Sequence, residues 1–91
     1  MPQCDKLYKR AQINPKGMRF TEACQLAECY GFVFDHQVGS HRQYKRPGYR
    51  GLVNLQDDNG MAKPYQVKQL LVHIEAIIKL MKEEEEEQEH E

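Results

Sequence analysis

The sequence predicts a small α+β domain in which helices pack on one face of a three-stranded antiparallel sheet. Two short helical patterns begin the chain, three β-rich segments follow, and a long apolar stripe at helical spacing starts after Pro64. Only a few residues link the β-rich segments, so these strands must run antiparallel. With 91 residues, the chain can bury one modest core.

The first two elements are short helices. Apolar residues recur at helical spacing over residues 4–13, and the Asn-Pro-Lys-Gly sequence at 14–17 predicts a turn. We expect Thr21 to be the N-cap of the second helix and Gly31 to end it in a left-handed conformation. No capping box supports this N-cap, because Cys24 occupies the position where Glu would be expected.

Three strands and a long helix complete the predicted fold. The β-rich segments at residues 32–36, 41–46 and 52–55 form a meander. Pro64 suits the first turn of the last helix. The apolar stripe that packs this helix on the sheet consists of Val67, Leu70, Leu71, Ile74, Ile77, Ile78 and Met81.

Composition indicates a soluble protein of the cytoplasm. Charged residues make up 30% of the chain, and no apolar run approaches the roughly 18 residues of a membrane span. We expect neither a signal peptide nor a membrane partner. The three cysteines, Cys4, Cys24 and Cys29, match no zinc or redox motif, so we expect reduced thiols.

The charges are strongly segregated. Residues 83–91 contain seven of the 14 acidic residues and no Lys or Arg, which leaves a body of about +6. A basic body suggests contact with nucleic acid. The acidic tail is either a solvated helix extension or a disordered end, and we also consider that it competes with RNA for the basic surface.

The most informative segment begins at Gly39-Ser40-His41 and continues through basic residues to Arg50. A flexible turn delivers an imidazole to the start of a strand, and imidazole transfers protons near neutral pH. The surrounding cations would attract a polyanion. RNA carries its own nucleophile, the 2′-hydroxyl, so a proton-transfer group on a phosphate-binding surface can cleave it without a metal or another cofactor.

From Arg19 to about Ile78 the sequence resembles the HicA family of toxin endoribonucleases from toxin–antitoxin systems. The resemblance is carried by six elements in order: Gly31-Phe32, Gly39-Ser40-His41, Tyr44, Pro47-Gly48, Gly60 and Lys63-Pro64. It implies a fold like a double-stranded-RNA-binding domain (α-β-β-β-α), cleavage of messenger RNA, and an inactivating antitoxin of the HicB type. It also implies that His41 is the catalytic residue. The longer segment before Arg19 and the acidic tail depart from the family pattern.

We therefore divide the chain into a helical extension (residues 1–18), a HicA-like domain (19–82) and the acidic tail (83–91). Strand alternation favours a solvent-facing side for His41 and Lys45, with Lys45 beside the reacting phosphate, whereas Tyr44 packs in the core. Tyr49 is the better candidate for stacking on bases. The residues expected to contact RNA are Ser40, Arg42, Lys45, Arg46, Arg50 and Lys63.

His36 is a possible second acid or base. Pairing across the hairpin would bring it near His41, but alternation gives it the face of Phe32 and Phe34, which points into the core. Two further functions remain open: a non-catalytic RNA-binding module of the same fold, and an inactive family member that only binds an antitoxin.

Overall fold

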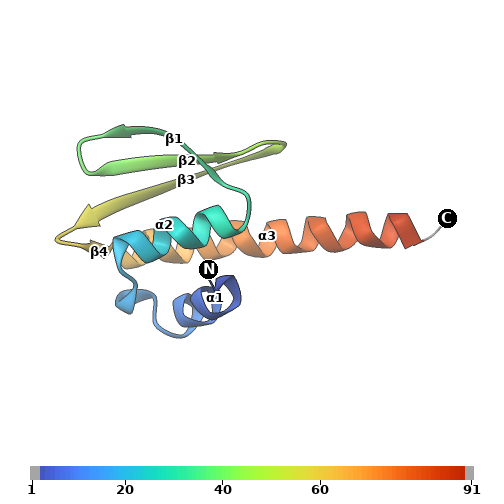
Figure 1. Ribbon diagram of the computed structural model, residues 1–91, viewed down its shortest axis with the longest axis horizontal. Helices are drawn as coiled ribbons and strands as arrows, with labels where there is room; N and C mark the ends of the chain where they lie inside the picture. The colour runs from blue at the N-terminus through green and yellow to red at the C-terminus, as the bar shows by residue number, and fades with distance from the viewer. Residues whose placement is uncertain (1–2, 90–91) are drawn as a thin grey trace.

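The computed structural model describes residues 3–89, and Figure 1 shows their arrangement. Within this range the chain forms three α-helices, four strands and one turn of 3₁₀ helix. In chain order they are α1 (Cys4–Ile13), the 3₁₀ turn η1 (Pro15–Gly17), α2 (Phe20–Cys29), β1 (Val33–Val38), β2 (His41–Arg46), β3 (Tyr49–Asp58), β4 (Met61–Ala62) and α3 (Pro64–Glu89).

The sheet has four antiparallel strands in the order β1-β2-β3-β4, so the prediction of three strands was wrong in number. The fourth strand contains only Met61 and Ala62, which pair with Asp58 and Asp57. Two residues are too few to produce a period-two pattern, and this is why the sequence did not reveal the strand. β3 is also longer than the predicted 52–55 segment.

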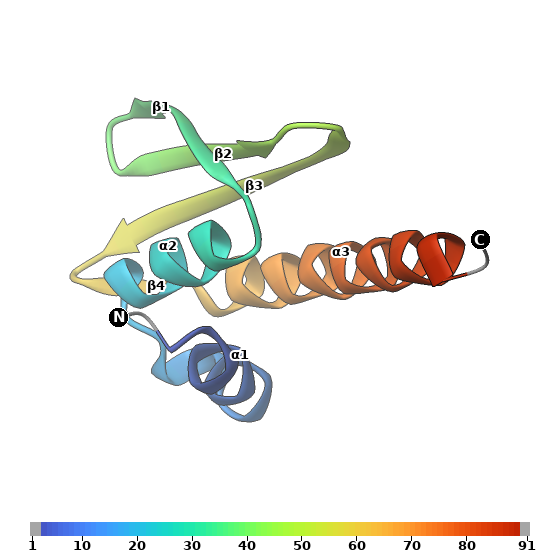
Figure 2. The ribbon, with the colours of Figure 1, turned by 45° about the vertical axis from the view of Figure 1, so that its right-hand side comes forward.

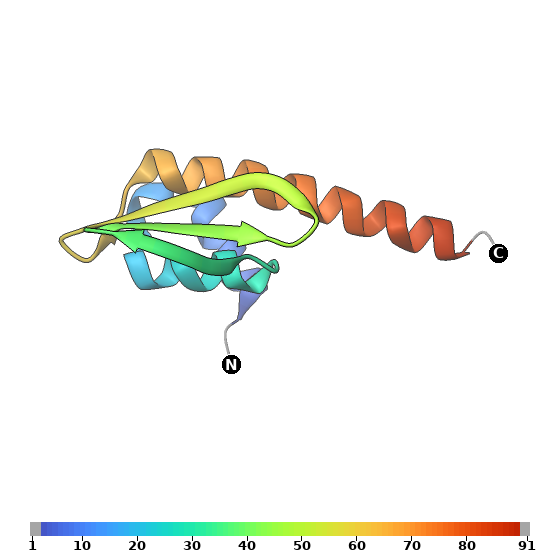
Figure 3. The same ribbon diagram turned by 90° about the horizontal axis from the view of Figure 1, so that it is seen from above.

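The molecule has three layers. The sheet lies over α2 and α3, and α1 packs against the side of these helices that faces away from the sheet (Figures 1 and 2). Seen from above, the strands run roughly in the same direction as the two helices, with α3 along one side and α2 along the other (Figure 3). The largest side chains of the core, all less than 2% exposed, come from every layer except α1: Met18, Leu26, Phe32, Tyr44, Leu55, Val67, Leu70, Ile74 and Ile77.

The N-cap of α2 lies two residues earlier than expected. Its N-cap is Arg19 rather than Thr21, and the Arg19 backbone N–H donates a hydrogen bond to Oε1 of Glu22 at 3.0 Å. With the N-cap at Arg19, Glu22 occupies the N3 position, so the helix start has the capping interaction that we did not expect from an N-cap at Thr21. The earlier start buries Phe20. Gly31 follows the helix with φ of +90°, as expected.

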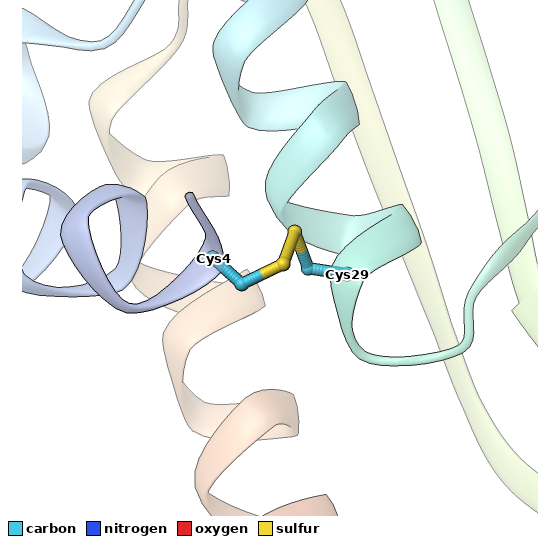
Figure 4. The surroundings of a disulfide bond; sticks show 2 residues. All are labelled: Cys4 and Cys29. Carbon is cyan, nitrogen blue, oxygen red and sulfur yellow. A yellow bond between two sulfur atoms is a disulfide. The ribbon is translucent and has the colours of Figure 1, made fainter. Parts of the chain in front are cut away.

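The expectation of three reduced thiols is contradicted by a disulfide. Cys4, in the first turn of α1, is bonded to Cys29, in the last turn of α2, with the Cα atoms 5.7 Å apart (Figure 4). Cys24 is a free, buried thiol. Spacing along the chain does not indicate this pairing, because α1 and α2 meet only when the 3₁₀ turn between them reverses the chain.

The acidic tail continues α3 as a helix. The helix extends past Lys82 to Glu89 and projects beyond the turn between β2 and β3 (Figure 1). The side chains of residues 83–86 are exposed, and residues 90–91 of the expected tail lie outside the described part. Within the described residues, no helix is both long enough and apolar enough to cross a membrane.

Candidate proton-transfer site and nucleic-acid interface

One face of the sheet is left uncovered by the helices of residues 3–89. Tyr44, Val53 and Leu55 point towards α2 and α3 and are at most 2% exposed. Their neighbours in the strands point the opposite way, onto what we call the outer face. From the pairing register, the outer face carries Val33, His36 and Val38 on β1, His41, Gln43 and Lys45 on β2, and Leu52, Asn54 and Gln56 on β3.

His41 is exposed at the start of β2, beside the turn that precedes it. Gly39 has φ of +59°, a left-handed conformation that glycine adopts without a steric cost. The Asp57 backbone N–H donates to the Ser40 carbonyl oxygen at 3.0 Å and ties the turn to β3. His41 pairs with Val38 on one side and Gln56 on the other. The turn therefore holds His41 at a fixed, solvent-accessible position.

A β-bulge changes the expected position of His36. Phe34 pairs with Tyr44, yet the next pair along the strands joins His36 to Gln43, so Asp35 is an extra residue in β1. An extra residue reverses the alternation that follows it. His36 therefore lies on the outer face with Gln43, and the prediction that it shares the core-facing side of Phe34 was wrong.

Asp35 connects His36 to Lys45. Its Oδ2 atom lies 2.7 Å from Nδ1 of His36 and 3.4 Å from Nζ of Lys45. The hydrogen bond from His36 and, after it, the charge of Lys45 lower the pKa of the Asp35 carboxyl group. Asp35 was not among the expected site residues. Its only signal in the sequence is that it directly precedes a histidine.

Lys45 does not lie beside His41. The two residues are four positions apart in β2, which separates their Cα atoms by about 13 Å at the rise of an extended strand. Gln43 lies between them on the outer face. The structure therefore separates Lys45 from His41 instead of placing the two side chains side by side, as we expected.

Arg42 and Arg46 lie on the helix-facing side of β2. The guanidinium carbon of Arg42 is 5.3 Å from the centre of the Phe20 ring and 5.7 Å from that of Phe34. Its Nε donates to Oε1 of Gln37 at 2.9 Å. Arg46 donates to the carbonyl oxygen of Tyr30, also at 2.9 Å. Both guanidinium groups thus contact other residues of the domain, on the side of the sheet opposite the outer face.

The remaining expected contacts are spread over the molecule. Ser40 is exposed in the turn, and Arg50 is exposed beside the opposite end of the sheet. Lys63 is half-buried, with its Nζ 3.4 Å from Oδ2 of Asp58. Of these three residues, only Ser40 lies close to His41, because it directly precedes it in the chain.

Tyr49 is not the exposed aromatic that we expected. Its ring packs edge-on against Phe32, and its hydroxyl oxygen lies 2.7 Å from Nδ1 of His73. Gly51 fits tightly against this pair, since a Cβ atom there would be 2.4 Å from Tyr49 and 2.6 Å from His73. Tyr49 thus docks the β2–β3 hairpin onto α3.

These features define a class of protein: a small α+β domain with an open antiparallel sheet, on which a turn presents an exposed histidine. The chain belongs to the HicA toxin family of bacterial toxin–antitoxin systems, because the model of that family matches residues 20–76, more than half of the chain. The match runs from α2 into α3 and excludes α1. Comparisons with curated proteins and with solved structures gave no significant match.

Proposed function

We propose that this protein is a metal-independent endoribonuclease that cleaves messenger RNA, with His41 as the proton-transfer residue. The observation that carries the proposal is the exposure of His41 on a sheet face that none of the described helices covers. Membership of the HicA toxin family supports it further. A flexible single strand can approach such a face without any rearrangement of the fold.

The chemistry requires little from the protein. A base takes the proton of a 2′-hydroxyl, the 2′-oxygen attacks the adjacent phosphorus, and the bond from phosphorus to the 5′-oxygen breaks. An acid then protonates that 5′-oxygen, which leaves a 2′,3′-cyclic phosphate and a 5′-hydroxyl. One positioned acid–base group contributes typically about 10²- to 10⁴-fold to the rate.

We infer that Ser40, Lys45 and Arg50 contact the RNA backbone. All three side chains are exposed, and the two cations lie along the same sheet as His41. Lys63 is a weaker candidate because it is half-buried and close to Asp58. For Arg42 and Arg46 we propose a structural role instead, since their guanidinium groups already have partners within the domain.

We further propose that a HicB-type antitoxin neutralises this activity in the cytoplasm, where messenger RNA is available. The support is family membership, since the matching family consists of toxins from toxin–antitoxin systems. An antitoxin that covered the outer face would exclude RNA from His41.

The test is cleavage of a synthetic RNA in the presence of EDTA. We expect the wild-type protein to cleave, and His41→Ala to lose about 10²- to 10⁴-fold in rate while keeping its fold, as measured by circular dichroism. Full activity of the folded His41→Ala variant would contradict the proposal.

The same assay separates the rival functions. Fluorescence anisotropy with labelled RNA measures binding independently of cleavage. Binding without scission by the wild-type protein would select a non-catalytic RNA-binding module. Binding to an antitoxin alone, with neither RNA affinity nor scission, would select an inactive family member.

A further inference from the structure

Scission of RNA requires two proton transfers, one from the 2′-hydroxyl and one to the departing 5′-oxygen. A single imidazole can perform only one of them in a concerted step. If His41 has the role proposed above, a second group is needed near it. The need for this second group rests on the proposed function.

His36 is the titratable side chain that the bulge brings to the same face. It pairs with Gln43, which is two residues from His41 on β2, so His36 and His41 are diagonal cross-strand neighbours. Such neighbours have Cα atoms about 7–8 Å apart. Both side chains are exposed. This separation leaves room for a phosphodiester between the two rings, with one imidazole on either side.

Asp35 fixes the orientation of the His36 ring. The 2.7 Å contact between its Oδ2 and Nδ1 of His36 requires a proton on Nδ1, so Nε2 is the nitrogen left for exchange with a substrate. The carboxylate also compensates the positive charge of a protonated ring. The other charged group at this position is Lys45, whose Nζ approaches the same carboxylate oxygen at 3.4 Å.

We propose that His36 is the second proton-transfer residue of the site, acting as the general acid, and that Asp35 is its positioning residue. His41 then takes the 2′-hydroxyl proton as the general base. As the bond from phosphorus to the 5′-oxygen breaks, Nε2 of His36 gives its proton to that oxygen. The neutral His36 ring and the protonated His41 ring return to their starting states by exchange with water.

Lys45 is the alternative acid on this face. Its Cα atom is about 13 Å from that of His41 along β2, and its ammonium group pairs with Asp35. A lysine at that distance is better suited to hold a flanking phosphate. His36 is closer, and its side chain is held by a hydrogen bond.

The test uses two RNA oligonucleotides that differ by one atom. One has a normal phosphodiester at the cleavage site, mapped beforehand with the wild-type protein, and the other has sulfur in place of the 5′-oxygen. A thiolate leaves without being protonated, so only the normal substrate needs a general acid. The variants are His36→Asn, which keeps an N–H group for Asp35, together with Asp35→Asn and His41→Ala. Gln12→Ala, exposed on α1 in the layer farthest from the sheet, is the control.

We expect His36→Asn to slow cleavage of the normal RNA by about 10²-fold or more and to cleave the sulfur-containing RNA at nearly the wild-type rate. Asp35→Asn should show a smaller loss with the same dependence on the leaving atom and an unchanged KM. His41→Ala should lose activity on both substrates, and Gln12→Ala on neither.

Two results would overturn the assignment of His36 while leaving the proposed function intact. One is wild-type cleavage of the normal RNA by His36→Asn, and the other is an equal loss on both substrates, which would indicate a role in binding. If the wild-type protein cleaved no RNA, or if His41→Ala remained fully active, the proposed function would fail and this assignment with it.

Discussion

The disulfide between Cys4 and Cys29 fastens α1 to the end of α2. α1 precedes the segment that the HicA family model matches, so the bond joins an added helix to the family domain. Leu7 and Ala11 of α1 are buried in the same core as α2 and α3. The N-terminal extension is thus an integral layer of the fold.

Reduction of this disulfide should destabilise the protein. The bonded residues are 25 apart in sequence, and a cross-link of that length restricts the unfolded chain by about 3.5 kcal/mol in the chain-entropy model. We expect dithiothreitol to lower the thermal midpoint by roughly 10 °C or more, since 1 kcal/mol corresponds to about 4–8 °C in a domain of this size. Differential scanning calorimetry measures the change.

The control for this prediction is the double variant Cys4→Ser/Cys29→Ser. It should have the reduced midpoint from the start and should not respond to dithiothreitol. Cys24 is buried and remains in both proteins, so it cannot account for a difference between them. Equal midpoints of the oxidised and reduced wild-type protein would contradict the prediction.

Local sequence patterns identified most of the elements. The limits of α1 and β2 agree with the predicted segments 4–13 and 41–46, because apolar spacing and turn residues specify both locally. The position of His36 could not be predicted in this way. A single extra residue at Asp35 reverses every later side chain in the strand, and nothing in the local composition indicates it.

The disulfide between Cys4 and Cys29 could not be predicted for a different reason. A disulfide depends on which helix ends meet in three dimensions, and residues 14–17 determine that meeting without any signal at the cysteines themselves. The roles of Arg42 and Arg46 were also beyond the sequence pattern. Alternation separates basic residues between the two faces of the sheet, but it does not show what they contact. In the structure, Arg42 packs over two aromatic rings and Arg46 donates to the carbonyl oxygen of Tyr30.

The buried hydroxyl of Tyr44 should make stability fall at alkaline pH. Burial raises the pKa of Tyr44 to about 12, against about 10 in an unfolded chain. The stabilisation is therefore complete below pH 10 and is lost as pH rises through 12, by roughly 2–3 kcal/mol. Urea unfolding at pH 9 to 12 should show a shallower pH dependence for Tyr44→Phe. The exposed Tyr65→Phe variant should keep the wild-type dependence.

Arg42 should affect stability rather than RNA affinity. Arg42→Lys keeps the charge but removes the planar group that lies over Phe20 and Phe34 and the hydrogen bond to Gln37. We expect a loss of about 1 kcal/mol in the free energy of unfolding and an unchanged dependence of RNA binding on salt. Arg50→Lys, at an exposed position, is the matched control and should leave stability unchanged. A loss of RNA affinity without a loss of stability would contradict this role.

Lys45 should contribute one phosphate contact. In a His41→Ala background, which binds without cleaving, Lys45→Ala should reduce the slope of log affinity against log salt by about 0.7. Lys9→Ala removes the same charge from α1, in the layer farthest from the sheet, and should leave the slope unchanged. Anisotropy titrations at several salt concentrations give both slopes. Equal slopes for the two variants would mean that the outer face does not hold the RNA backbone.

The acidic end of α3 should act on RNA only through its long-range field. The helix runs past the β2–β3 turn, whereas His41 lies at the other end of β2, so contact between the tail and the site of the same molecule is not expected (Figure 1). Truncation after Lys82 should therefore leave RNA affinity unchanged at 0.15 M salt, where the screening length is about 8 Å. At about 0.01 M salt, where that length is about 30 Å, the truncated protein should bind more tightly. Tighter binding of the truncated protein at both salt concentrations would instead mean that the tail occupies the RNA surface directly.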